Sequence, residues 1–310
     1  NENKNIEAKQ KHLQTFVDRF RAKASKATQA QSKLKQLQRL QSIEIAHPLR
    51  RVRIHIPQVL PKNSFAVRTN HLGIGYPEHP IARGIEFEIL RGDHVAIVGE
   101  NGQGKSTLLR TFAGLLEPID GSFCWGNRMT FAYYDQHVHR MLHEQDTVGN
   151  YLERIAAREL GREDILRMAS NFLFSIDDLT KSISMLSGGE RERLCLAGIL
   201  LQKHDVLLLD EPTNHLDFET VEALGEALNK FHGTIFFISH SRTFVHQIAK
   251  TILEVRAGQV KRYPFTYDEY VYHLQQDLGA LTTDAETAEL PQLSEKQRLH
   301  QEITEIKKQI

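Results

Sequence analysis

The stretch Gly99–Thr107, GENGQGKST, sets the interpretation of the whole chain. It fits the pattern G-x-x-x-x-G-K-[ST], with Gly99, Gly104, Lys105 and Ser106 in register. Glycines at these places let backbone N–H groups turn inward around phosphate oxygens, and a helix that begins here adds partial positive charge. The stretch therefore predicts a nucleotide-binding loop in which the Lys105 ammonium reaches the β- and γ-phosphates and the Ser106 hydroxyl ligates Mg²⁺.

The sequence on either side of the loop supports this interpretation. The apolar run HVAIV at 94–98 is typical of a short buried strand, and STLLRTFAGLL at 106–116 is typical of a helix. A strand before the loop and a helix after it are the context that the motif requires. The residues of this loop that we expect to contact the nucleotide are Gly99, Asn101, Gly102, Gly104, Lys105, Ser106 and Thr107.

A second run supplies the carboxylates that a nucleotide-hydrolysing site needs. VLLLDEPTNHLD at 206–217 begins as a buried apolar strand, which ends in Asp210 and Glu211. Two adjacent carboxylates after such a strand are unfavourable unless they are paired or bind a metal. We expect Asp210 to hold the Mg²⁺ shell and Glu211 to polarise the attacking water.

The other runs predict the surrounding fold. VRIHI (52–56), SFAVRTNHLGI (64–74) and GIEFEIL (84–90) alternate like strands and predict an antiparallel β layer. TIFFISH (234–240) predicts another parallel central strand, and residues 146–202 are mostly helical in pattern. TILEVRAGQVKRY (251–263) predicts a hairpin that turns at Ala257–Gly258, and residues 279–291 are typical of a linker.

Three further motifs resemble those of ATP-binding-cassette (ABC) ATPases, in that family's order. LSGGE at 186–190 resembles the signature sequence, YYDQ resembles the glutamine loop with Gln136, and ISHSRTF resembles the histidine switch with His240. The resemblance covers residues 50–265. It implies an α/β P-loop cassette fold with an antiparallel β subdomain and a helical subdomain, and it implies ATP and Mg²⁺ as cofactors.

The resemblance also implies roles for individual residues. Two cassettes of this family close face to face, so Ser187, Gly188 and Gly189 would contact the γ-phosphate held by a partner cassette. Gln136 would sense Mg²⁺ and water, and His240 would hydrogen-bond the γ-phosphate. The expected catalytic residues are thus Glu211, His240 and Gln136, and the expected metal ligands are Ser106, Gln136 and Asp210.

Tyr76 is the aromatic residue that we expect to stack on adenine, because it lies just upstream of the first cassette strands. Phe65 and Phe87 are weaker alternatives, which strand alternation assigns to the core. By the same resemblance, Asp217 would lie at the contact between two cassettes. Ser241 departs from the family, which usually has Asp after the switch histidine, but either residue can cap the helix that follows.

The beginning of the chain differs from the rest in charge and periodicity. Residues 1–55 carry 13 Lys and Arg against 4 Asp and Glu, although the net charge of the whole chain is zero. Residues 3–42 contain no Gly or Pro, and apolar side chains recur there at the alternating spacings of four and three that indicate a coiled-coil seam. The seam positions are Leu13, Val17, Phe20, Ala24, Ala27 and Leu34, with the polar Gln31 as a further candidate between the last two.

The segment at 16–37, FVDRFRAKASKATQAQSKLKQL, resembles the linker of the ABC-F family of translation-associated ATPases, and EPTNHLD supports that resemblance. In this family a helical linker joins two cassettes and enters the ribosome near the peptidyl-tRNA. We therefore interpret the chain as the second half of such a protein. Its expected parts are a basic linker helix (1–47), a cassette (48–278), and a linker with the start of a C-terminal coiled coil (279–310).

The resemblance implies two kinds of partner. One is a second cassette, which comes from a missing N-terminal half or from another copy of the chain. The other is the ribosome, through rRNA or tRNA at the linker, where a stiff basic helix suits a phosphate backbone. The linker's basic residues are Arg19, Arg21, Lys23, Lys26, Lys33 and Lys35.

Two other function classes stay open: the ATPase subunit of a membrane transporter, and a DNA-associated ABC ATPase. Only 82 positions separate Lys105 from Ser187, which excludes a structural-maintenance ATPase with a long coiled coil between them. The basic linker argues against a transporter subunit. No apolar run approaches the ~20 residues that span a bilayer, so we expect a cytoplasmic protein without a membrane partner. Cys124 and Cys195 lack metal spacing and are interpreted as reduced core residues.

Overall fold

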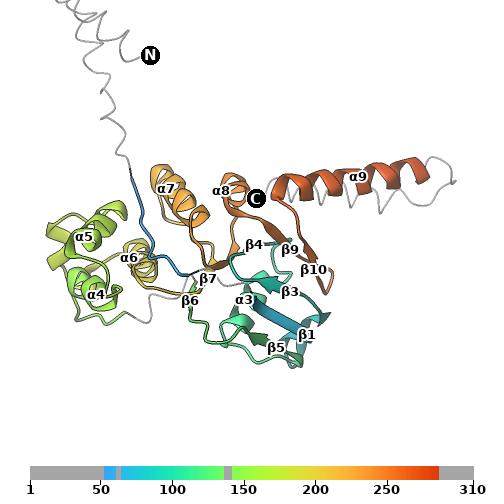
Figure 1. The fold of residues 1–310 in the computed structure, drawn as a ribbon, viewed down its shortest axis with the longest axis horizontal. Helices are drawn as coiled ribbons and strands as arrows, with labels where there is room; N and C mark the ends of the chain where they lie inside the picture. The colour runs from blue at the N-terminus through green and yellow to red at the C-terminus, as the bar shows by residue number, and fades with distance from the viewer. Residues whose placement is uncertain (1–51, 61–63, 136–141, 286–310) are drawn as a thin grey trace, which may run out of the picture. The chain divides into compact units, whose positions relative to one another are not determined.

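The computed structural model describes residues 52–60, 64–135 and 142–285 of the 310-residue chain (Figure 1). The predicted linker helix at 1–47, the predicted coiled coil after 286 and Gln136 lie outside the described residues. Those three expectations therefore stay predictions.

A six-stranded sheet forms the centre of the cassette, in the order β10-β9-β4-β8-β7-β6. All neighbouring strands are parallel except β9 and β10, which are antiparallel. Every residue of β4, β7 and β8 is buried, which explains why these strands are continuous apolar runs in the sequence. The strands are β4 (His94–Val98), β6 (Phe131–Tyr134), β7 (Val206–Asp210), β8 (Thr234–Ile238), β9 (Thr251–Arg256) and β10 (Gln259–Tyr263).

The hairpin of β9 and β10 confirms the prediction for 251–263. Ala257 and Gly258 form its turn, and both have positive φ, 49° and 76°. Two left-handed residues in a two-residue turn match the right-handed twist of the flanking strands.

The predicted antiparallel layer is confirmed for the residues after position 64. The strand β1 pairs with β2, β3 and β5. The helix that follows the glycine-rich loop, α3, packs beside this layer, and its Phe112 contacts Phe87 of the antiparallel region and Phe236 of the parallel sheet, with ring centroids 6.2 and 5.5 Å apart. One hydrophobic core therefore joins the two sheets. The elements are β1 (Phe65–Tyr76), β2 (His79–Ile85), β3 (Glu88–Leu90), α3 (Lys105–Phe112) and β5 (Asp120–Trp125).

The expectation that VRIHI at 52–56 is a strand is wrong. Ile54 and Ile56 are buried and alternate with exposed residues, but this segment pairs with no strand among the residues that the structure describes. Side chains satisfy part of its backbone instead: the Asn171 Nδ2 donates to the Arg53 carbonyl at 2.7 Å. Ile54 and Ile56 alternate with exposed residues because they pack in the same core as buried side chains of residues 148–201, and not because they belong to a sheet.

The residues between 146 and 202 are mostly helical, as predicted. The helices α4, α5 and α6 contact one another and lie in the green and yellow part of Figure 1. The helix α6 also contacts β6, so this group is attached to the parallel sheet. The helices are α4 (Val148–Ile155), α5 (Arg162–Asn171) and α6 (Gly188–Leu201), with short 3₁₀ turns η3 (Asp177–Thr180) and η4 (Ile183–Met185).

The two cysteines differ in environment. Cys195 on α6 is buried, as predicted. The expectation that Cys124 is a core residue is wrong, because its side chain is exposed. Its neighbours Phe123 and Trp125 on β5 pack on the core between the sheets, so alternation turns Cys124 to the opposite face.

Three helices complete the described fold. The helix α7 (Phe218–Asn229) contacts α8 (Arg242–Ile248), and α8 contacts α9 (Tyr267–Ala285). The helix α9 runs through residues 279–285, so the expectation of a linker from 279 is wrong for those residues. Within the part of the chain that the structure describes, no helix has the length and apolar character to span a bilayer.

Candidate nucleotide-binding site

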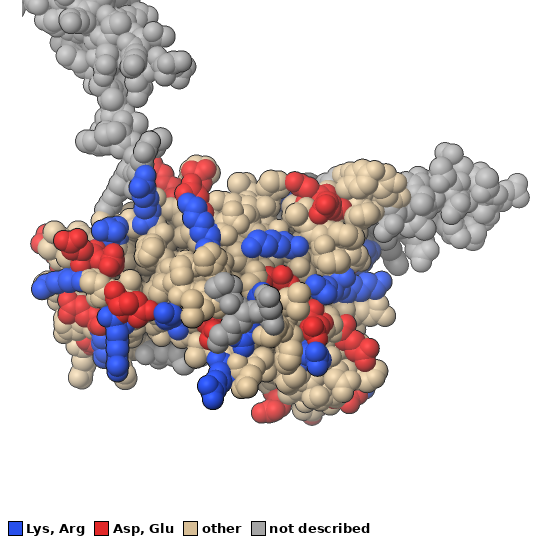
Figure 2. Space-filling model, viewed as in Figure 1, with Lys and Arg blue, Asp and Glu red and all other residues tan. Residues whose placement is uncertain are grey.

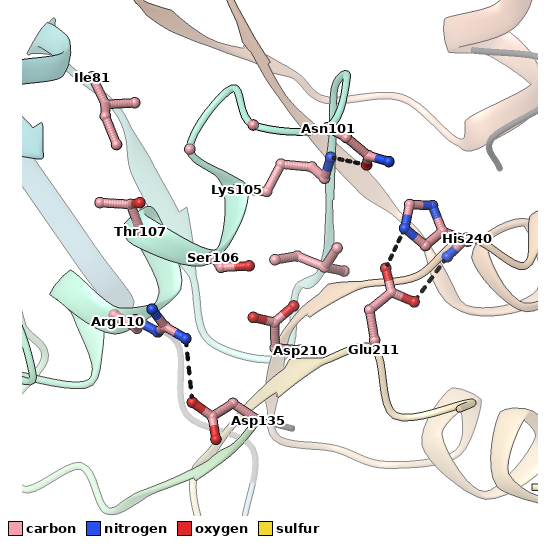
Figure 3. Close-up of a pocket in the computed structure, with 13 residues that line it drawn as sticks. Ile81, Asn101, Lys105, Ser106, Thr107, Arg110, Asp135, Asp210, Glu211 and His240 are labelled. Atoms are coloured by element: carbon pink, nitrogen blue, oxygen red, sulfur yellow. Dashed lines mark hydrogen bonds and ion pairs between the residues drawn. The ribbon is translucent and has the colours of Figure 1, made fainter. Parts of the chain in front are cut away.

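The carboxyl ends of four adjacent parallel strands meet at one edge of the sheet. The glycine-rich loop follows β4, Asp135 follows β6, Asp210 ends β7, and His240 comes just after β8. Such an edge is where ligands bind in α/β folds. These strand ends surround a cavity of about 430 Å³ (Figure 3). Its lining residues are Ile81, Asn101, Gly102, Gly104, Lys105, Ser106, Thr107, Arg110, Asp135, Asp210, Glu211, Ile238 and His240.

Two glycines shape the loop. Gly102 and Gly104 have φ of +79° and +103°, in the region that side chains rarely adopt. A Cβ at Gly102 would meet open space, whereas a Cβ at Gly104 would collide with the Ile81 side chain. Gly104 directly precedes the first turn of α3, where the backbone N–H groups have no helical acceptor. The close approach of Ile81 therefore requires glycine at the start of this helix.

The Lys105 side chain folds back over the loop. Its Nζ donates to the carbonyls of Gly99 and Glu100 at 2.7 and 2.8 Å, and it lies 3.4 Å from the Asn101 Oδ1. Burial lowers the pKa of Lys105, and the nearby carboxylates of Glu211 and Asp210 partly oppose that shift. An anion in the cavity would therefore stabilise the charged ammonium.

Asp210 and Ser106 have the chemistry of a magnesium site. Asp210 is 8% exposed, and burial raises the pKa of its carboxyl while a hydrogen bond with Ser106 lowers it. A carboxylate and a hydroxyl are hard oxygen ligands of the kind that Mg²⁺ binds, together with phosphate oxygens. In the described ranges, no three His, Cys, Asp or Glu side chains gather into a metal site. The donors present thus fit a cation that takes its remaining ligands from a bound nucleotide or water.

Glu211 and His240 form a compact pair beside these ligands (Figure 3). The Glu211 Oε2 accepts from the His240 backbone N–H at 3.1 Å, and the Oε1 lies 3.3 Å from the His240 Nε2. Burial raises the pKa of the Glu211 carboxyl, and the neighbouring His240 opposes that shift. The Glu211 backbone is left-handed, with φ of 53°. A strained backbone at a buried carboxylate is typical of functional sites.

Sequence reasoning missed two charged residues in the cavity. Arg110 lies one helical turn after Ser106 on α3, and its Nη2 is 3.7 Å from the Asp135 Oδ2. The Tyr133 hydroxyl donates to the same carboxylate at 3.2 Å. Helical spacing from Ser106 could have found Arg110, and the end of β6 could have found Asp135. Ile81 left no signal, since only the packing of β2 on the loop brings it there.

The signature residues do not line this cavity. Ser187 begins α6 in a capping box: its backbone N–H and its hydroxyl donate to the Glu190 Oε2 at 2.8 and 2.6 Å, and the Glu190 N–H donates back at 3.4 Å. At the first turn of the same helix, Gly188 is exposed and Gly189 is half-buried. The helix start is thus well formed, and its residues are not among those that line this cavity.

Gly99 and Tyr76 also lie outside the lining. Tyr76 ends β1 and is 46% exposed. Phe87 is a core residue as expected, whereas Phe65 is half-buried and lies under the Arg68 guanidinium, 4.6 Å from the ring centroid. The assignment of Tyr76 to adenine therefore rests on its place in the sequence.

Ser241 caps α8, as expected, and Asp217, which was expected at the contact between two cassettes, caps α7. Ser241 accepts from the Phe244 N–H at 3.4 Å, so α8 forms with serine in place of aspartate. Asp217 accepts from the Thr220 N–H at 2.8 Å and caps α7. Gln136 lies outside the described residues, so no geometry is assigned to it.

Comparison with known proteins agrees with this geometry. A family model described as ABC transporter matches residues 82–214, the span from β2 to the carboxylates and the loop after them. The chain contains an ABC ATPase domain. A second ABC transporter model matches residues 1–54.

Curated relatives extend the match of the ABC ATPase domain on both sides. The ATP-binding protein YdiF of Bacillus subtilis is 36% identical over 90% of this chain and 44% of its own length. ABC transporter F family member 5 of Arabidopsis thaliana is 33% identical over 86% of this chain and 38% of its own length. The chain thus spans less than half the length of these relatives.

Solved structures have the same fold. The ATP-binding subunit of an ABC transporter superposes with a TM-score of 0.58 at 23% identity, covering 69% of this chain and 93% of that one. A chain in the complex of the archaeal ribosomal stalk protein aP1 with the ribosome recycling factor aABCE1 gives a TM-score of 0.54 at 28% identity. That match covers 68% of this chain and 40% of the other.

Proposed function

We propose that the ABC ATPase domain binds Mg·ATP in the cavity at the strand ends and hydrolyses it when a second cassette completes the site. The observation that carries this proposal is the convergence of Lys105 at the start of α3 with Asp210 and Glu211 at the end of β7, on a cavity that includes a helix N-terminus. A cation, two carboxylates and free N–H groups are the set that a triphosphate and its metal need.

Binding uses the loop and its lysine. The backbone N–H groups of the loop and of the α3 start cradle the phosphates, and the Lys105 Nζ exchanges its carbonyl contacts for β- and γ-phosphate oxygens. When bound, Mg²⁺ neutralises charge on the phosphates and is held by Ser106 and Asp210. Tyr76 stacks on the adenine in this proposal.

Hydrolysis uses Glu211 and His240. The oxygen of a water molecule attacks the γ-phosphorus, the Glu211 carboxylate accepts the proton, and the bond to the β–γ bridging oxygen breaks, which releases ADP and phosphate. The raised pKa of Glu211 favours this role, because a carboxylate that binds protons more tightly is a stronger base. His240 holds the Glu211 carboxylate and hydrogen-bonds the γ-phosphate.

The place of the signature residues supports a second cassette. Ser187, Gly188 and Gly189 do not line their own chain's cavity, and Ser187 and Gly188 are exposed. A helix N-terminus of this kind can donate to an anion held by another molecule. The second cassette comes from a preceding half of the protein or from another copy of the chain.

The wider role that we propose is that of an ABC-F type protein acting on the ribosome in the cytoplasm. The resemblance of 16–37 to the ABC-F linker and the F family name of the Arabidopsis relative support it. The basic surplus at 1–55 suits RNA phosphates. On the face of the cassette in Figure 2, acidic and basic side chains are interspersed, and in this proposal the N-terminal segment supplies the anion-binding surface.

Calorimetry with Mg·ATP tests the site. We expect wild-type binding that disappears with EDTA, and a loss of at least tenfold in affinity for Lys105→Ala, because the phosphates lose a half-buried cation. The exposed Lys203→Ala is the matched control and leaves affinity unchanged. Absence of magnesium-dependent binding would overturn the proposal. Fast turnover that is independent of protein concentration would exclude the need for a second cassette.

Cosedimentation tests the wider role. The Glu211→Gln variant of the intact protein should bind ATP, stay closed and remain on ribosomes in the presence of ATP. A variant that binds ATP but never associates with ribosomes would exclude the translation role. A preference for branched DNA over ribosomes in the same assay would favour a DNA-associated ATPase, and copurification with a membrane protein would favour a transporter subunit.

A further inference from the structure

The loop after Glu211 is attached to the fold at two points. On one side, the Thr213 and Ser239 hydroxyls lie 3.1 Å apart, which joins the loop to the end of β8 next to His240. On the other side, the His215 Nε2 lies 3.1 Å from the Glu192 Oε2 on the signature helix α6. The loop therefore bridges the hydrolytic carboxylate and the helix that carries the signature.

Both the backbone and the ring of His215 are placed for contact with α6. Its backbone is left-handed, with φ of 62°, which directs the ring toward α6 at the cost of local strain. The ring also covers the signature glycine: a Cβ at Gly189 would lie 3.6 Å from the His215 Nδ1 and 3.7 Å from its Cγ. His215 thus contacts the first turn of α6 by packing and its second turn through the Glu192 carboxylate.

Glu192 is the more buried member of the pair. Its side chain is 14% exposed, against 53% for His215. Its charge acts on Tyr134 of β6 and on Cys195 of the same helix, where it adds to burial in raising the pKa of both. A carboxylate in such a place is unfavourable without a partner, so loss of His215 would leave it uncompensated.

We propose that His215 is a positioning residue, which holds the signature turn Ser187–Gly189 in register with Glu211 of the same chain through Glu192. The inference rests on the proposed function, since the signature acts on a nucleotide in a second cassette. In this arrangement a shift of the Glu211 loop on hydrolysis moves the signature turn with it. Neither His215 nor Glu192 lines the nucleotide cavity, so ATP binding does not depend on them.

The main variant is His215→Asn. Asparagine tolerates left-handed φ but is too short to reach Glu192, so it removes the contact and keeps the backbone. The matched control is His71→Asn, because His71 also has positive φ, 46°, and pairs with a glutamate, Glu86, at 2.9 Å, but lies on the antiparallel sheet. Glu192→Gln keeps an acceptor for the histidine and is the conservative rescue, while Glu192→Ala removes it.

Steady-state ATPase assays of the intact protein give the first test. His215→Asn and Glu192→Ala should each lower kcat about tenfold with the KM for ATP within twofold, and the double variant should be no worse than either single variant. Glu192→Gln and His71→Asn should retain wild-type kcat. An unchanged kcat for His215→Asn, or a rise in KM equal to the fall in kcat, would overturn the inference.

Hydrogen exchange gives a second test that needs no ATPase activity. Amides of 187–192 should exchange at least threefold faster in His215→Asn than in wild type or His71→Asn, because α6 loses an anchor at its start. Faster exchange in a protein without ATPase activity would contradict the proposed function and leave the positioning contact intact. Unchanged exchange there would overturn the positioning role itself.

Discussion

The Glu211 carboxylate contacts His240 through both oxygens, at 3.1 Å to the backbone nitrogen and 3.3 Å to the ring Nε2. The two residues follow the neighbouring strands β7 and β8, so the pairing of these strands in parallel fixes their separation. The Glu211 carboxylate is buried, lines the cavity, and has both oxygens in contact with His240, so its position is fixed. Such a carboxylate is suited to accept a proton from a water molecule bound at one position in the cavity.

Glu211→Gln should separate turnover from binding. The amide keeps the size and the acceptor of Glu211 but cannot take a proton, so kcat should fall by roughly 10²–10⁴-fold, the usual contribution of a general base. The affinity for Mg·ATP should change less than threefold by calorimetry. The exposed Glu222→Gln on α7 serves as control. Equal losses in binding and turnover would show that Glu211 acts in binding.

Gly104→Ala should abolish tight nucleotide binding, whereas Gly102→Ala should be milder. Both positions have positive φ, which costs an alanine about 1 kcal/mol. Only at Gly104 would the new methyl also collide with Ile81, which must then displace the loop or the strand β2. Calorimetry with Mg·ATP should give at least a tenfold difference in Kd between the variants. Equal Kd values would mean that Ile81 adapts without cost.

His94 should make the cassette sensitive to acid. Its side chain is fully buried at the start of β4, with the Nε2 3.0 Å from the Phe231 carbonyl, and burial lowers its pKa to about 4, with Lys250 adding to the shift. The unfolded chain, with a histidine pKa near 6.5, therefore binds more protons between pH 6.5 and 4. The free energy of unfolding should fall by about 3 kcal/mol as the pH drops through that window.

Urea unfolding at pH 7.5 and pH 4.5 measures this dependence. His94→Gln removes the titrating group and should flatten the pH dependence, even if the variant is less stable at pH 7.5. His232→Gln changes a histidine that is exposed and should leave the slope unchanged. The same slope in wild type and His94→Gln would rule out His94 as the acid-sensitive group.

Tyr270→Phe should destabilise the attachment of α9. The buried Glu254 accepts from the Tyr270 hydroxyl at 2.9 Å and from the Tyr263 hydroxyl at 3.1 Å. Removing the buried Tyr270 donor leaves one carboxylate oxygen uncompensated, which costs about 1–3 kcal/mol. Tyr263→Phe, at a half-buried position, should cost less because water can replace it. Thermal unfolding measures both, and a smaller loss for Tyr270→Phe than for Tyr263→Phe would contradict this ranking.

Much of the site could be predicted from the sequence, because its chemistry requires particular residues close together in the chain. A phosphate loop needs glycines, a lysine and a hydroxyl at fixed spacing, and six of its seven predicted residues line the cavity. Strand β7 is buried on both faces, and its sequence is therefore a continuous apolar run, which predicted the strand. The two carboxylates after that run predicted where the strand ends. Parallel strands end at one edge, which is why residues distant in sequence could be expected to meet.

Contacts between different helices, strands and loops could not be predicted from the sequence in the same way. The alternation of Ile54 and Ile56 was real, yet it reflects packing beside Asn171 and not a strand. Tyr76 was expected at the nucleotide but lies outside the cavity lining, while Arg110 and Ile81 were not expected and line it. Cys124 faces solvent because its two neighbours on β5 take the core side.

The sequence by itself determined the phosphate loop, the carboxylate pair, the alternation of strands and helices, and the basic character of residues 1–55, because each depends on residues close together in the chain. Only the tertiary structure decided that Ile81 closes on Gly104, that His240 holds Glu211 and that His215 reaches Glu192. These contacts join residues whose approach depends on how whole sheets and helices pack, and side-chain spacing along the chain carries no record of that packing.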